Sequence, residues 1–192
     1  MTDHGSVMEK LKEWIDEKRL NHSLGVSRCA VELAGYYGAD VGKAELAGML
    51  HDCAKGLSFE RSLELAKEFG IEFDMIFKMN PALLHAPLGS YLARDVFGIQ
   101  DVEILEAIAC HTTGKKDMTL LEKVLCLADY IEEGRNFPGV EKIRELAFVD
   151  INRALLTGLE MSIQAVLKSG MLLHPMTVGA RNALLLEIQN TD

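Results

Sequence analysis

Helical periodicity dominates this sequence and narrows the folds that the chain can adopt. Apolar residues recur every three or four positions, and no segment alternates as a half-buried strand would. The pattern predicts helices at about 6–19, 22–37, 41–54, 59–69, 85–97, 101–112, 118–133, 138–147, 150–169 and 176–189. Short connections without a linker or repeat predict one compact all-α domain over residues 1–192, with a core at about 18–135 and C-terminal helices at about 138–190.

Charge and cysteine usage exclude several classes of protein. Acidic residues outnumber basic ones by 29 to 20, and the formal net charge of −9 argues against a nucleic-acid partner. The four cysteines stand singly, so neither a disulfide framework nor a thiolate zinc site is expected. No run approaches the roughly 20 apolar residues that span a bilayer. We therefore expect a cytoplasmic protein without a membrane partner, whose abundance of Leu, Met and Ala allows a homodimer.

Four histidines lie on the apolar faces of predicted helices. His22, His51, His85 and His111 each extend an apolar stripe near a helix end, as His111 does for the stripe that begins at Ile104. A single histidine in such a place usually bonds a backbone carbonyl. Four of them in one small domain favour a shared function.

Two carboxylates extend this set. Asp129 follows the apolar run 124–128, and because an unpaired buried carboxylate costs several kcal/mol, it needs a partner. A buried arginine is one alternative partner and a metal ion is another. Asp52 directly follows His51, and neighbouring helix residues point about 100° apart, so the two side chains can converge only near a helix end. Gly56 marks such an end, although Asp52 could instead face water there.

Together these six residues offer imidazole nitrogens and carboxylate oxygens without thiolates. Such donors suit iron, manganese, cobalt, nickel or zinc. Six ligands exceed what one catalytic zinc uses, whereas two ions that share a bridging carboxylate would use all six and leave positions for water and substrate. We expect one or two divalent transition-metal ions, with iron favoured. His4 and His174, which lie outside the apolar stripes, are given no role.

The motifs around these residues resemble those of the HD-domain phosphohydrolase superfamily, whose helical fold binds metal through an H…HD…D pattern. The matching segments read RLNHS at 19–23, AGMLHDCAK at 47–55, LLH at 83–85, HTTG at 111–114 and LADYIEEGR at 127–135. Within that superfamily they resemble the YqeK-like bacterial branch, which is associated with symmetrical hydrolysis of diadenosine tetraphosphate. The resemblance implies one ion on His22, His51, Asp52 and Asp129, and a second ion on Asp52, His85 and His111.

Several further residues are candidates for binding phosphate. Lys55 lies three residues after Asp52, where it would grip a phosphate or simply face solvent as a lysine near a helix end. Arg19 and Arg135 offer guanidinium groups to phosphate, or are surface arginines. The residues Thr112, Thr113 and Gly114 offer hydroxyl and backbone donors, or form a helix C-cap with a left-handed glycine.

Three functions remain open at this stage. The leading hypothesis is a hydrolase that cuts diadenosine tetraphosphate to two ADP by metal-activated water, with Asp52 and Lys55 as catalytic residues. The second is an HD-domain nucleotidase or nucleoside triphosphate phosphohydrolase that acts on mononucleotides. The third is a nucleotide-binding sensor without turnover. The complete ligand set favours an enzyme.

Overall fold

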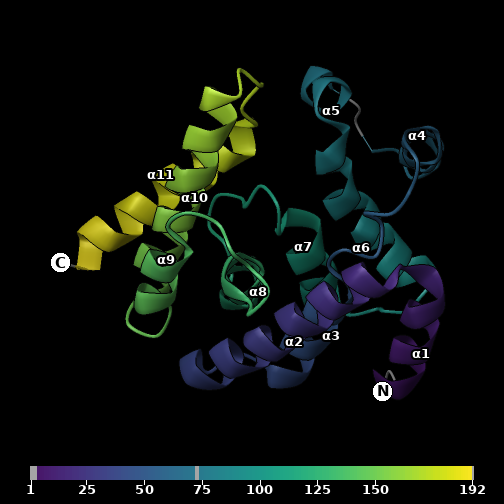
Figure 1. Cartoon of the computed structure of the whole chain (residues 1–192), viewed down its shortest axis with the longest axis horizontal. Helices are drawn as coiled ribbons and strands as arrows, with labels where there is room; N and C mark the ends of the chain where they lie inside the picture. The colour runs from purple at the N-terminus through teal and green to yellow at the C-terminus, as the bar shows by residue number, and fades with distance from the viewer. Residues whose placement is uncertain (1–3, 72–73, 192) are drawn as a thin grey trace.

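The computed structural model describes residues 4–71 and 74–191, and in this part of the chain every regular element is a helix (Figure 1). The elements are α1 (His4–Trp14), α2 (Glu17–Tyr37), α3 (Val41–Leu50), α4 (Phe59–Glu68), α5 (Met75–Met79), the 3-10 helix η1 (Pro81–Leu84), α6 (His85–Asp95), α7 (Val102–Cys110), α8 (Leu120–Ile131), α9 (Val140–Ala147), α10 (Ile151–Lys168) and α11 (Pro175–Thr191). The all-α prediction is confirmed. Residues 1–3, 72–73 and 192 of the expected domain lie outside the described residues.

The predicted break between the first two helices was wrong. The first helix ends at Trp14 and not near residue 19, because the Asp16 side chain caps α2 by accepting a hydrogen bond of 2.8 Å from the Arg19 backbone N–H. Arg19 and His22 therefore lie in the first turns of the same helix. The short elements α5 and η1 were missed, because neither has the length over which a helical period can be read.

Helices α2 and α3 approach each other closely, and Gly48 makes this possible. A Cβ atom at Gly48 would lie 2.6 Å from the Cα atom of Ser27, so any larger residue would push the two backbones apart. The contact brings the end of α3, where His51 lies, against the first turns of α2, where His22 lies.

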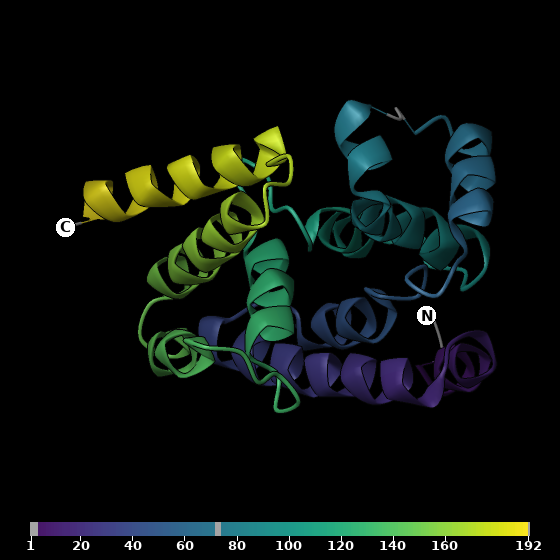
Figure 2. The ribbon, with the colours of Figure 1, turned by 45° about the horizontal axis from the view of Figure 1, so that its top comes forward.

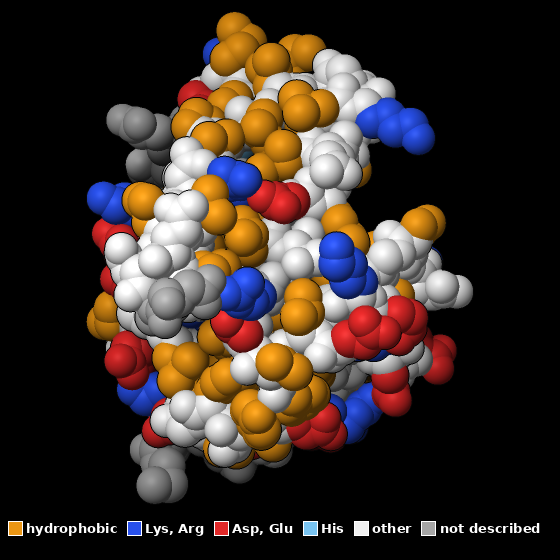
Figure 3. All heavy atoms as spheres, turned by 90° about the vertical axis from the view of Figure 1, so that its left-hand side faces the viewer, with side chains coloured by type: hydrophobic (Ala, Val, Ile, Leu, Met, Phe, Trp, Pro, Cys, Tyr) orange, Lys and Arg blue, Asp and Glu red, His pale blue; other side chains and the backbone are white. Residues whose placement is uncertain are grey.

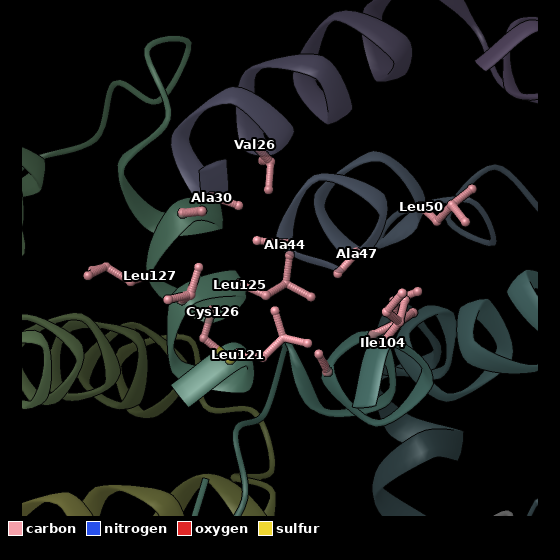
Figure 4. Close-up of a cluster of buried hydrophobic side chains, with 14 of the residues drawn as sticks. Val26, Ala30, Ala44, Ala47, Leu50, Ile104, Leu121, Leu125, Cys126 and Leu127 are labelled. Carbon is pink, nitrogen blue, oxygen red and sulfur yellow. The ribbon is translucent and has the colours of Figure 1, made fainter. Parts of the chain in front are cut away.

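The core lies where α2, α3, α7 and α8 meet. Figure 4 shows side chains such as Val26 on α2, Ala47 on α3 and Leu125 on α8 gathered between these helices, and all three are fully buried. A buried leucine stabilises the fold by about 1.5–3 kcal/mol relative to an exposed one. This packing makes a rigid base for the polar residues at the helix ends.

The C-terminal helices lie on the other side of α8. Helix α8 packs against α2 and α3 as well as against α9 and α10, and α11 packs on α10 (Figures 1 and 2). Leu167 at the end of α10, and Met171 and Leu172 in the turn to α11, are exposed. Figure 3 shows hydrophobic side chains gathered at the top of the molecule, the end at which Figure 1 places this turn. The homodimer stays a prediction. None of the helices in the described ranges combines the length and the apolar character that a membrane span needs.

Candidate metal centre

The four predicted histidine ligands come from four separate elements and meet at one place. Their Nε2 atoms face each other in pairs: the Nε2 atoms of His22 and His51 are 3.3 Å apart, and those of His85 and His111 are 3.1 Å apart. His51 is fully buried, and His85 and His111 are nearly so. The two other histidines lie elsewhere, since His4 contacts Glu45, while the ring of His174 lies against Phe77.

Each of these four imidazoles is held through its other ring nitrogen. The Nδ1 atoms of His51 and His111 lie 2.8 Å from the backbone carbonyl oxygens of Gly48 and Ile108, and His85 makes the same kind of bond to a carbonyl. A carbonyl can only accept a hydrogen bond, so Nδ1 must carry the proton in these three rings. The carbonyl bond expected of an ordinary core histidine is therefore present, and it aims the Nε2 lone pair at the centre of the cluster.

Burial keeps two of these rings neutral. Burial lowers the pKa of His51 to about 4 and also lowers the pKa of His85, because a buried imidazolium loses its hydration. With the proton on Nδ1, the Nε2 atoms of His85 and His111 point lone pairs at each other across 3.1 Å. Two lone pairs at this distance repel unless a cation binds both of them, so this donor set fits a metal ion.

Asp52 lies between the two histidine pairs and is completely buried. Its Oδ2 atom is 3.6 Å from the Nε2 atoms of both His22 and His51, whereas its Oδ1 atom is 3.2 Å from Nε2 of His85 and 3.8 Å from that of His111. Oδ1 accepts no hydrogen bond although it is buried. One carboxylate oxygen thus faces each pair, as a ligand that bridges two ions would.

The carboxylate of Asp52 stays ionised in this setting. Burial by itself would raise its pKa. The Arg19 guanidinium and the Lys55 ammonium both contact its Oδ2 atom and favour the charged form. Helix α3 ends at Leu50, four residues before the predicted end, so His51 and Asp52 lie in the turn that follows. This end of the helix lets two consecutive side chains reach one centre.

Asp129 completes the donor set from the last turn of α8. Its Oδ1 atom lies 3.1 Å from Nε2 of His22 and 3.7 Å from that of His51. The same oxygen pairs with the guanidinium of Arg135, whose Nε also donates to the Asp129 carbonyl at 2.6 Å. Both partners that the sequence left open for Asp129, an arginine and the metal-ligand cluster, are therefore beside it.

Arg19 and Lys55 contact the other carboxylate. The Nη1 atom of Arg19 lies 2.5 Å from Asp52 Oδ2, and the Nζ atom of Lys55 lies 3.1 Å from the same oxygen. Both side chains are about one-third exposed. Together with Arg135 they form a cationic rim around the donor cluster, within reach of a phosphate that enters from solvent.

The segment Thr112–Gly114 divides into two parts. The hydroxyl oxygen of Thr112 lies 3.1 Å from the Nε2 atoms of both His85 and His111, so it borders the cluster. The hydroxyl of Thr113 is buried and donates to the Gly114 carbonyl. Gly114 has φ of +63° and donates its backbone N–H to the Cys110 carbonyl at 2.7 Å. It therefore has the predicted left-handed conformation, but it closes the turn after α7, whose C-cap residue is His111. Substrate contacts by these three residues stay a prediction.

A pocket of about 660 Å³ opens beside the cluster, between α2 and the loop after α8. His22 is part of its wall, which connects the pocket to the donor cluster. The cationic side chains in its lining are Lys18, Arg19, Arg28, Lys55 and Arg135. Two carboxylates, those of Glu132 and Glu133, also line the pocket, so cations outnumber anions there by five to two. In a chain with a formal net charge of −9, this local excess of positive charge indicates an anionic ligand.

Comparison with known proteins places this arrangement in a family. The model of the HD domain matches residues 19–134, a span that contains all six donors. The chain belongs to the HD-domain family. The His-Asp dipeptide of this family is His51–Asp52 here, and Asp52 lies between the two histidine pairs. Membership of the family implies dependence on a divalent metal.

Relatives cover nearly the whole chain. A protein from Halalkalibacterium halodurans, named symmetrical bis(5'-nucleosyl)-tetraphosphatase, is 43% identical over 96% of this chain and 98% of its own length. A protein of the same name from Bacillus subtilis is 41% identical over 87% of this chain and 89% of its own. The crystal structure of an HD superfamily hydrolase from Clostridium acetobutylicum, described as involved in NAD metabolism, is 43% identical with a TM-score of 0.93 and covers 97% of this chain and 99% of that one.

Sequence reasoning missed Glu132, which holds the fourth histidine. Its Oε1 atom lies 3.1 Å from Nδ1 of His22, and its Oε2 atom accepts the backbone N–H of Gly134 at 2.6 Å. Glu132 is nearly buried, and a Cβ atom at Gly25 would come within 2.6 Å of its carboxylate. The signal in the sequence was its position three residues after Asp129, which puts both on one face of the predicted helix 118–133. In the structure Glu132 is the C-cap residue of α8.

Replacing Glu132 by glutamine is expected to weaken metal binding by about 10-fold. A carboxylate that accepts the Nδ1–H of His22 fixes the tautomer and makes Nε2 a better donor, and a neutral amide does this less well. Metal dissociation constants obtained by competition with a chelator would measure the effect.

The matched control is Glu133→Gln, which neutralises the exposed neighbouring carboxylate. It should leave the dissociation constant unchanged. Equal affinities in the wild type and Glu132→Gln would show that Glu132 has no part in holding the metal.

Proposed function

We propose that this HD-domain protein is a metal-dependent phosphoanhydride hydrolase that cuts dinucleoside tetraphosphates symmetrically into two nucleoside diphosphates. The observation that carries the proposal is the convergence of four imidazoles and two carboxylates beside a pocket rich in cationic side chains. Two relatives that cover nearly the whole chain bear the name of this activity. A polyphosphate satisfies both features. Its negative charge complements the cationic rim, and its phosphoanhydride bonds are of the kind that such a metal centre hydrolyses.

The proposed ligands divide into two groups that share Asp52. One group consists of His22, His51, Asp52 and Asp129, and the other consists of Asp52, His85 and His111. Two observations support this division. The two oxygens of Asp52 face different histidine pairs, and within each pair the Nε2 atoms face each other. Nitrogen and oxygen donors without thiolate suit iron, which we favour, and also manganese, cobalt, nickel or zinc.

The chain's own residues then account for much of the chemistry. When bound, divalent ions polarise a phosphoryl oxygen and lower the pKa of a coordinated water. Water adds to the second phosphorus, the bridging oxygen leaves with the far half of the substrate, and that oxygen takes up a proton. Lys55 and Arg19 offset the charge of the phosphates, and Arg135 extends this contact along the pocket. The nucleotide is thereby held in line for attack.

The products decide between this function and its alternatives. Diadenosine tetraphosphate should give only ADP, and the pentaphosphate should give ADP plus ATP, because a fixed distance from the nucleoside to the metal centre selects the second phosphate. Mononucleotides should be poor substrates, since they lack the far half whose binding aligns the reacting centre. Chromatography of early time points would measure both.

Other product patterns would contradict the proposal in distinct ways. AMP plus ATP from the tetraphosphate would exclude a symmetrical cut. Faster turnover of a deoxynucleoside monophosphate would indicate a nucleotidase. Binding without any turnover, by protein whose metal content has been verified, would indicate a sensor.

A further inference from the structure

A second pocket lies directly beside the metal centre and differs from the first in character. Its volume is about 390 Å³, within the range of about 300–1,000 Å³ that is usual for small-molecule sites. Apolar groups make up most of its wall, including Tyr130 from α8, Phe137 and Pro138 from the loop that follows, and Met161 from α10. Such a wall suits a flat, weakly polar ligand group better than a phosphate.

The pocket also carries a small polar feature. The hydroxyls of Tyr130 and Ser162 lie 2.8 Å apart, and either one can be the donor. Gly158 lets the Tyr130 ring pack onto α10, because a Cβ atom there would lie 3.1 Å from the ring. The pair therefore presents both a hydrogen-bond donor and an acceptor to a ligand group that lies against the ring.

Two residues connect this pocket to the reacting centre. Asp129 lines the apolar pocket and also belongs to the donor cluster around His22 and His51. Arg135 lines both the apolar pocket and the cationic one. A ligand that extends from one pocket to the other must therefore pass the guanidinium of Arg135 and the carboxylate of Asp129.

We propose that the apolar pocket binds the nucleoside of the substrate half whose second phosphorus is attacked by water. This inference rests on the proposed function. The base lies against the apolar wall, its polar edge meets the Tyr130 and Ser162 hydroxyls, and its phosphates run past Arg135 to the metal centre. The distance from this pocket to the metal centre thus selects the second phosphorus from the bound nucleoside as the point of attack.

Filling the pocket without touching the metal centre would test this assignment. Ala165 is an exposed residue at the rim of the apolar pocket, so the Ala165→Phe variant should fold normally. The new phenyl ring should occupy the part of the pocket in which we place the base. The probes are ADP and inorganic pyrophosphate, titrated by calorimetry into the purified protein with its bound metal. We expect Ala165→Phe to raise the Kd for ADP at least 10-fold and to leave the Kd for pyrophosphate unchanged.

Leu167→Phe is the matched control, because it places the same ring two residues later on α10, about 200° around the helix and outside the pocket. It should change neither Kd. Unchanged ADP binding by Ala165→Phe, or an equal loss of ADP and pyrophosphate binding, would overturn the nucleoside site. Failure of the proposed function is seen separately, in the products that the wild-type protein forms from diadenosine tetraphosphate.

Discussion

Replacing Asp52 by alanine is expected to lower kcat by at least about 10³-fold, a loss of about 4 kcal/mol in transition-state stabilisation, and to lower the metal content of the purified protein. Asp52 is the one donor whose two oxygens face both histidine pairs, so its removal affects both proposed ion sites at once. Elemental analysis together with turnover of diadenosine tetraphosphate would measure the two effects.

The control is Asp95→Ala, which removes an exposed carboxylate paired with its neighbour Arg94. Surface pairs of this kind contribute little, so its kcat and metal content should match the wild type. Circular dichroism would verify that Asp52→Ala is still helical. A folded Asp52→Ala protein with near-wild-type turnover would disprove the assignment of Asp52 as a ligand.

Lys55→Ala is expected to lower kcat/KM by about 10²-fold, or about 2.7 kcal/mol, without loss of metal. The Lys55 ammonium lies 3.1 Å from Asp52 Oδ2 and lines the cationic pocket, so it is placed to contact a phosphate but offers no lone pair to a metal while charged. Steady-state kinetics and elemental analysis of the same preparation would separate the two roles.

Lys67→Ala removes the same charge from an exposed position on α4 and should leave kcat/KM unchanged. If Lys55→Ala loses metal as well as activity, the lysine positions Asp52 and does not grip the substrate. If its kinetics match those of the wild type, Lys55 is a surface residue.

The helices and the donor residues could be predicted from the sequence, because the patterns that indicate them involve only neighbouring residues. The period of apolar residues predicted the regular elements, and a histidine on an apolar face is visible from its neighbours within two turns. The position of His51 and Asp52 near a helix end followed from Gly56 alone, although α3 ends earlier than expected.

Errors arose where local signals compete or are short. Asp16 caps α2 and divides a stretch that reads as one continuous helix, so the first boundary was misplaced. The region 75–84 folds as α5 and η1, each too short for periodicity to reveal. Arg135 was expected to be a phosphate clamp or a surface residue, and its pairing with Asp129 depends on how the loop 132–135 turns back.

The sequence by itself determined that the chain is helical, that six polar donors lie on apolar faces, and that the pattern is that of an HD domain. Only the tertiary structure decided which donors face each other, that Glu132 holds His22, and that an apolar pocket lies beside a cationic one. The physical reason is one of range. Helix formation and burial depend on residues within a few turns, whereas Glu132 and His22 are 110 positions apart and meet only because Gly25 and the close packing of α2 against α8 leave room for the carboxylate.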